Sequence, residues 1–241
     1  MVRRPSPLLT AGLAYAGALA LLLLAPALPG IGGTGDANTI LSDAPAMVLL
    51  GACVLVLLPA RDELGPLALL ALGAGLLAAA CTEAGAIALG DVLKALFAGA
   101  LGLGLARLLA EPAVVVAVPL FVAAIDVASV AGGPTELLAR DDSRPGEFIS
   151  LYLPAWGGGR AGVIGVADLV FLGFFASGAW RFGLRRRVTA AALLAALPAT
   201  LLAQVLLDRT VPALPALAAA LLAPNADLLP GLVRRQPARR S

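Results

Sequence analysis

The sequence predicts an all-α, polytopic integral membrane protein with about eight transmembrane helices. Composition is the first reason, because 60% of the 241 residues are apolar, only 13% are charged, and the mean hydropathy is +0.96. Soluble domains average about 45–50% apolar and about 25% charged residues, so this chain cannot cover itself with a polar surface. The second reason is that apolar stretches, most of roughly 17 residues or more, recur along the whole chain.

Each stretch ends at charges, Pro or Gly, as transmembrane helices do. The first follows Arg3 and Arg4, but its apolar part is about twice as long as a signal-peptide core, so we expect a span and not a cleaved leader. The eight expected spans are 7–29, 44–60, 65–81, 84–110, 112–131, 161–180, 188–207 and 211–229.

These spans divide the chain into regions. Residues 1–111 hold about four N-terminal helices, and residues 112–230 hold four more together with an extramembrane loop at 132–160. Residues 231–241 form a basic tail. Cytoplasmic loops carry an excess of Lys and Arg. With the N-terminus inside, twelve arginines fall on the cytoplasmic side and four on the other side, so we expect a multi-pass protein of a bacterial cell membrane with both termini in the cytoplasm.

The residue inventory excludes several kinds of chemistry. The chain has no His, which excludes His-based triads, His general bases and His metal ligands. Cys53 and Cys81 lie far apart in apolar runs, so neither a disulfide framework nor a zinc cluster is expected. A net charge of +2 argues against a nucleic-acid partner. We expect no metal and no cofactor, and carboxylates remain as the candidate chemical groups.

Carboxylates inside a span are costly unless they face a bundle interior or water. Glu83, Asp91 and Asp208 fall at or near expected span ends, where a solvated helix end explains them, and Asp91 also forms an i,i+3 pair with Lys94. Asp126 and Asp168 differ, because small or apolar residues surround both and nothing local neutralises either one.

Asp126 and Asp168 are expected to face each other. The fifth span runs outward and the sixth inward, with Asp126 roughly 8 Å below the outer end of its span and Asp168 roughly 10 Å below the start of its own, at 1.5 Å per residue. Two carboxyls in contact in an apolar site share a proton, so that one acts as base and the other as acid. That is the chemistry of aspartic peptide hydrolysis, although a proton relay could use the same pair.

Three motifs follow one another in the second half of the chain. Ile125-Asp126 precedes a Ser-Val and a Gly-Gly-Pro-Thr-Glu-Leu-Leu run, and Gly165-Val-Ala-Asp168 and Pro212-Ala-Leu-Pro215 come later. Over roughly residues 112–229 this order resembles the intramembrane aspartyl proteases typified by presenilin and signal peptide peptidase. The resemblance implies a presenilin-like bundle with Asp126 and Asp168 as the catalytic pair. It also implies that the substrate cleft is bordered by Gly165, Ala167, Pro212, Ala213 and Leu214.

The predicted orientation is similar to that of signal peptide peptidase and inverted relative to presenilin. It implies that the substrates are transmembrane helices with a cytoplasmic N-terminus, or remnant signal peptides, within the lipid bilayer. Residues Glu147–Trp156 are rich in strand formers. They are expected to form either a plain interfacial loop or an extended segment that adds a strand to an unwound substrate.

The chain departs from the family pattern at two positions and leaves other functions open. Ile125 stands where the family has Tyr, and Ala167 replaces the second Gly of Gly-x-Gly-Asp. A protein that keeps the protease fold without activity is therefore one alternative, and a proton-coupled transporter that uses the same carboxylates is another. A prepilin-peptidase-like enzyme also uses two Asp residues, but it would be expected to have a basic residue soon after the second, where this chain has Leu169, Val170 and Phe171.

Overall fold

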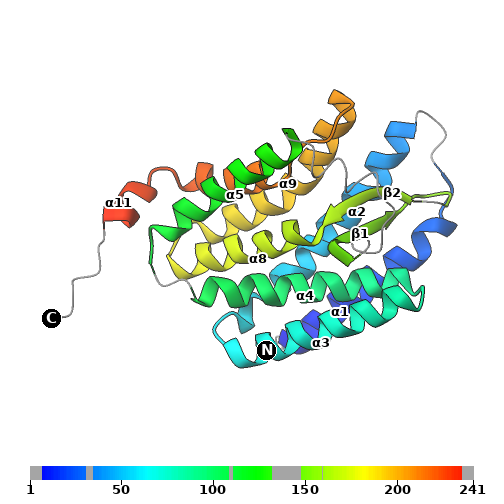
Figure 1. The fold of residues 1–241 in the computed structure, drawn as a ribbon, viewed down its shortest axis with the longest axis horizontal. Coiled ribbons are helices and arrows are strands. Elements are labelled where there is room, and N and C mark those ends of the chain that lie inside the picture. Colours follow the sequence, from blue (N-terminus) through cyan, green and yellow to red (C-terminus); the bar gives the residue numbers. More distant parts are fainter. Residues whose placement is uncertain (1–6, 31–34, 109–110, 132–147, 159, 235–241) are drawn as a thin grey trace, which may run out of the picture.

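The computed structural model describes residues 7–30, 35–108, 111–131, 148–158 and 160–234. Most of them are helical, and the longer helices run side by side along the long axis of the molecule (Figure 1). The single hairpin among these residues joins β1 (Ser150–Pro154) to β2 (Arg160–Gly165). The helices are α1 (Pro7–Leu24), α2 (Gly35–Val56), α3 (Leu64–Glu83), α4 (Ile87–Leu108), α5 (Val114–Ala131), α8 (Val166–Arg181), α9 (Arg186–Leu207), α10 (Leu214–Leu222) and α11 (Leu229–Arg234).

Five helical segments in the described part of the chain are long and apolar enough to cross a membrane. They lie in α1, α2, α3, α4 and α9, while α5 and α10 are apolar but shorter. Large apolar side chains such as Leu69 and Leu206, both 73% exposed, cover their outward faces. The chain is therefore a mostly helical protein with several helices that could span a bilayer, which is the coarse form of the predicted fold.

Each expected span contains a helix, but two helices begin elsewhere than predicted. Pro is favoured in the first turn of a helix, and Pro45 is consistent with a start near residue 44. Instead, α2 begins at Gly35 and Pro45 lies inside it. The expectation of a helix at 161–165 is wrong, because these residues belong to β2 and α8 begins only at Val166. The β-branched Val163 and Ile164, set between glycines, fit an extended strand better than a helix start.

Glycines bring α4 and α8 into close contact. Figure 1 shows α4 between α3 and α8, and α4 packs extensively against both. A Cβ added at Gly102 of α4 would overlap the main-chain oxygen of Val170 in α8, and one added at Gly173 would lie 3.3 Å from the main-chain oxygen of Gly99. Small residues at such a crossing let two backbones touch, which is the usual way that helices pack tightly in lipid. This contact fixes the position of α8.

The antiparallel hairpin leads directly into α8. Its register pairs Leu151 with Ile164 and Leu153 with Gly162, and both leucines are fully buried against the helices. Figure 1 places the hairpin near one end of α4 and α8, beside α2. The expected loop at 132–160 therefore contains a strand, β1, within Glu147–Trp156. Residues 132–147, including Glu147 and the Gly-Gly-Pro-Thr-Glu-Leu-Leu run, lie outside the described residues.

Arginines gather at the opposite end of α8. The guanidinium of Arg181 donates to the main-chain oxygens of Ala106 and Arg107, at 3.1 and 3.0 Å, and so caps the C-terminus of α4. Arg107 also lies 3.8 Å from the Asp62 carboxylate. Thus α8 has a hairpin at its first residue and an arginine-rich region at its last. Of the expected tail, residues 231–234 form the end of α11, and 235–241 lie outside the described residues.

Candidate active site

Asp168 lies in the first turn of α8, immediately after the hairpin. The main-chain N–H of Gly165, the N-cap residue, donates to its Oδ2 at 3.1 Å. A Cβ added at Gly165 would lie 3.0 Å from the same oxygen, so the glycine lets the carboxyl approach the backbone closely. The expected position of Asp168 well inside a helix is wrong, because residues 161–165 belong to β2 and α8 begins only at Val166.

Asp126 lies near the C-terminal end of α5 and meets the start of α10. The main-chain N–H of Leu214 donates to Asp126 Oδ2 at 3.0 Å, and the amide of Ala213 also interacts with this carboxyl. The Leu214 side chain itself is buried, so this residue contributes its amide to the site and its side chain to the core. The structure therefore brings the Pro-Ala-Leu motif against Asp126.

The two carboxyls come together although they lie on different helices. Helix α5 contacts α8, and α10 contacts both. Asp126 is close enough to Asp168 for the two to repel each other when both are charged. Both residues are partly exposed. The structure thus joins Asp126, Asp168, Gly165 and the start of α10 in one place.

The two residues that depart from the family pattern point away from the core. Ile125 is 52% exposed, and Ala167 is also exposed. Pro212 and Ala213 are half-buried beside the site. Neither Ile125 nor Ala167 is part of the core. Their side chains therefore affect what can lie beside the two carboxyls, and they do not affect how the helices pack.

Two further buried charges lie outside the expected positions. Asp91 was expected at a solvated helix end, but it is 1% exposed and forms an ion pair with Lys94, which is 2% exposed. The reason is that β1 covers this turn of α4. The i,i+3 spacing in the sequence identified the pair but not its burial.

Asp43 is a buried carboxyl that the sequence analysis missed. It is fully buried in α2, where Ser42 donates to its Oδ1 at 3.1 Å and its Oδ2 has no hydrogen-bond partner among the described residues. A Cβ added at Gly162 of β2 would overlap that oxygen. The predicted start of the second span at residue 44 left Asp43 outside the bundle, whereas a helix start at Gly35 would have placed it inside.

No protein-family model, curated protein or solved structure matches this chain. Among the described residues, no group of three or more Cys, Asp or Glu side chains is arranged to hold a metal ion. The chemical groups of the site are therefore the two carboxyls and the main-chain amides that bind them.

Proposed function

We propose that this protein is an intramembrane aspartyl endopeptidase that hydrolyses peptide bonds within transmembrane segments or remnant signal peptides. One observation carries the proposal. Asp126 lies within electrostatic range of Asp168, and each carboxyl accepts a main-chain N–H through Oδ2, one from the Pro-Ala-Leu motif and one from the glycine before α8. These contacts between sequence-distant groups support the proposal, which also rests on the resemblance to presenilin and signal peptide peptidase.

The chemistry requires one carboxyl ionised and the other protonated, which is the favoured state of two neighbouring acids. The carboxylate takes a proton from water as the water oxygen attacks the peptide carbonyl carbon. The carboxylic acid gives its proton to the carbonyl oxygen. The C–N bond then breaks as the newly protonated carboxyl gives its proton to the leaving nitrogen, while the other carboxylate takes a proton from a hydroxyl of the tetrahedral intermediate. Because the pair titrates as a unit, the shared proton is not assigned to either residue. The Gly165 and Leu214 amides hold the two carboxyls in place throughout.

The proposal includes a presenilin-like bundle of about eight spans with both termini in the cytoplasm. The arginine-rich end of α8, with Arg181 on the end of α4, then faces the cytoplasm, in keeping with the excess of positive charge on that side. The hairpin and the Asp pair lie toward the other face. Single-span segments with a cytoplasmic N-terminus are the corresponding substrates.

A peptide bond must leave its helix before water can attack it, and the hairpin offers a place for the unwound segment. Leu151 and Leu153 of β1 face Ile164 and Gly162, so the main-chain groups of Val163 point to the outer edge of β2. An extended segment that pairs with this edge would run toward Gly165 and Asp168. The expected segment Glu147–Trp156 does not have this role in the proposal, because β1 is paired with β2 on one edge and bound by α4 on the other; its partner strand β2 takes the role instead.

The test is cleavage of a panel of single-span reporters by the purified protein in liposomes. Asp126→Asn and Asp168→Asn are expected to abolish cleavage while the protein still inserts, because each removes one member of the pair. Asp208→Asn is the matched control, since Asp208 is an exposed carboxyl at the end of α9. Cleavage that survives either substitution within the pair contradicts the proposal.

The same liposomes distinguish the two alternatives. Proton flux that depends on Asp126 and Asp168, without any cleavage, would favour a proton-coupled transporter. A folded protein that neither cleaves nor conducts would favour a protease fold without activity, and Ile125→Tyr with Ala167→Gly would then be expected to restore cleavage.

A further inference from the structure

The buried ion pair between Asp91 and Lys94 of α4 takes no part in the proposed chemistry. The Lys94 Nζ lies 2.9 Å from Asp91 Oδ1, and both side chains are almost completely buried. Removing two charges from water is costly, and a buried pair adds little net stability unless its remaining hydrogen-bonding groups are also satisfied. The partners of these two side chains therefore indicate what the pair does.

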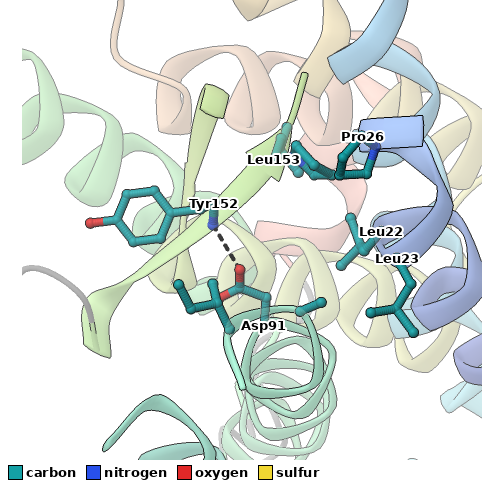
Figure 2. Close-up of a pocket in the computed structure, with 9 residues that line it drawn as sticks. Leu22, Leu23, Pro26, Asp91, Tyr152 and Leu153 are labelled. Atoms are coloured by element: carbon teal, nitrogen blue, oxygen red, sulfur yellow. Dashed lines mark hydrogen bonds between the residues drawn. The ribbon is translucent and has the colours of Figure 1, made fainter. Parts of the chain in front are cut away.

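Both side chains bind the main chain of β1. Lys94 Nζ donates to the Ser150 main-chain oxygen at 2.9 Å, and Asp91 Oδ2 accepts the main-chain N–H of Tyr152 at 3.1 Å. Figure 2 shows the Asp91 carboxyl reaching up from its helix to the Tyr152 amide beneath the strand. One side chain thus supplies a donor and the other an acceptor, as a neighbouring strand would.

These contacts lie on the edge of β1 that faces away from β2. Residues two apart in a strand present their main-chain groups to the same edge, so Ser150 and Tyr152 point outward while Leu151 and Leu153 bind β2. An unpaired strand edge is a template for pairing with another chain. The ion pair occupies this template, whereas no strand among the described residues pairs with the outer edge of β2, which is therefore its open edge.

We propose that Asp91 and Lys94 act as a substitute strand that closes the outer edge of β1 and holds the hairpin against α4 before any substrate arrives. The two are positioning residues, because they touch neither Asp126 nor Asp168. The role in peptide hydrolysis rests on the proposed function, whereas the attachment of the hairpin does not.

The register connects this attachment to the Asp pair. Ser150 is paired with Gly165, and Gly165 donates to Asp168. Lys94 therefore holds the strand residue directly opposite the N-cap of α8. The turn end of the hairpin has its own attachments. Asn38 Nδ2 donates to the Trp156 main-chain oxygen at 3.1 Å, and the Gly157 N–H donates to the Leu28 main-chain oxygen at 2.7 Å. The ion pair holds the end next to the carboxyls.

Hydrogen exchange of the unmodified protein gives the first test. The Tyr152 amide donates to the Asp91 carboxylate and not to β2, so protection of this amide from exchange would report that contact. We expect the Tyr152 amide to exchange at least about 100-fold more slowly than the Val163 amide, which lies on the open edge of β2. Equal exchange of the two amides would overturn the proposal without any variant being made.

The double variant Asp91→Leu/Lys94→Met gives the second test. It replaces the pair by apolar side chains of similar size, a change that generally preserves stability. We expect a protein that still folds, at least about tenfold faster exchange of the Ser150–Tyr152 segment, and a reporter-cleavage kcat reduced at least about tenfold. Asp227→Asn breaks the exposed ion pair with Arg185 and serves as the control, with no change expected.

The outcomes separate the two proposals. A folded double variant with unchanged exchange in β1 overturns the role of the pair, whatever the activity. Faster exchange together with unchanged kcat overturns the positioning role and leaves only the attachment of the strand. Asp91→Asn/Lys94→Gln keeps a donor and an acceptor without charge, so it is expected to retain slow exchange. If the unmodified protein cleaves no reporter, the proposed function fails while the exchange measurements still decide the attachment of the hairpin.

Discussion

Replacing Gly102 by Ala tests the close crossing of α4 and α8, on which the position of Asp168 depends. The added Cβ would overlap the main-chain oxygen of Val170 and lie 3.1 Å from the main-chain nitrogen of Phe174. Both atoms belong to the backbone of a helix, so neither can rotate away. We expect α8 to move by roughly 1 Å to restore ordinary packing distances.

Two opposing effects set the change in the free energy of unfolding that Gly102→Ala causes. Gly→Ala inside a helix gains about 1 kcal/mol from helix propensity, while overpacking a tight interior costs about 1–3 kcal/mol. Because the obstructing atoms are backbone, the upper end of that range applies to Gly102, and the net loss is about 2 kcal/mol. For a chain of this size that corresponds to a melting temperature lower by about 4–8 °C. Displacing a reacting group by about 1 Å can lower a rate by about 100-fold.

Gly104 on the same helix is the matched control. A Cβ there would meet only the Leu64 side chain, at an ordinary 3.8 Å. Helix propensity then decides, so Gly104→Ala should be neutral or stabilising by up to about 1 kcal/mol. Thermal unfolding in detergent and reporter cleavage should be measured for both variants. Equal melting temperatures for Gly102→Ala and Gly104→Ala would refute this account of the crossing.

Substitutions at four further positions test other parts of the structure. Asn225 is fully buried and bonds Arg185 N, Thr189 Oγ1 and the Leu221 main-chain oxygen, so Asn225→Ala should cost about 3 kcal/mol in thermal unfolding. Gly165→Ala, with its Cβ 3.0 Å from the Asp168 carboxyl, should reduce cleavage at least about tenfold without changing the melting temperature. Asp208 ends α9 at a φ of 47°, so Asp208→Ala should cost about 1 kcal/mol and Asp208→Gly should not; equal melting temperatures would contradict this. Ile125→Tyr should leave thermal unfolding unchanged, because the side chain is exposed.

The positions of Asp126 and Asp168 illustrate what the sequence can predict. Their apolar surroundings mark both as carboxyls that need a partner, and the antiparallel direction of their helices brings them together. The Pro-Ala-Leu motif was expected beside them by resemblance, and Leu214 does bind Asp126. The sequence does not reveal that the Leu214 main-chain amide makes this contact, because the residue type does not indicate which main-chain N–H groups act as donors.

The hairpin and its attachments could not be predicted in the same way. Val163 and Ile164 are as apolar as a membrane helix, so hydropathy joined them to α8, and only their pairing with β1 distinguishes strand from span. The burial of Asp91 likewise depends on β1, which is distant in sequence. Local patterns predict helices well, but they do not predict which segment will cover a given turn.

The most direct measurement of the central claim uses an inhibitor whose hydroxyl group replaces the attacking water, because its binding requires both carboxyls and no knowledge of the natural substrate. A peptide isostere of this kind resembles the tetrahedral intermediate, and such analogues bind at least about 100-fold more tightly than substrates. We predict that it binds the unmodified protein and the Asp208→Asn control, and that Asp126→Asn and Asp168→Asn each weaken binding at least about 100-fold. Equal affinity for all four proteins would contradict the claim that the two carboxyls form one catalytic pair.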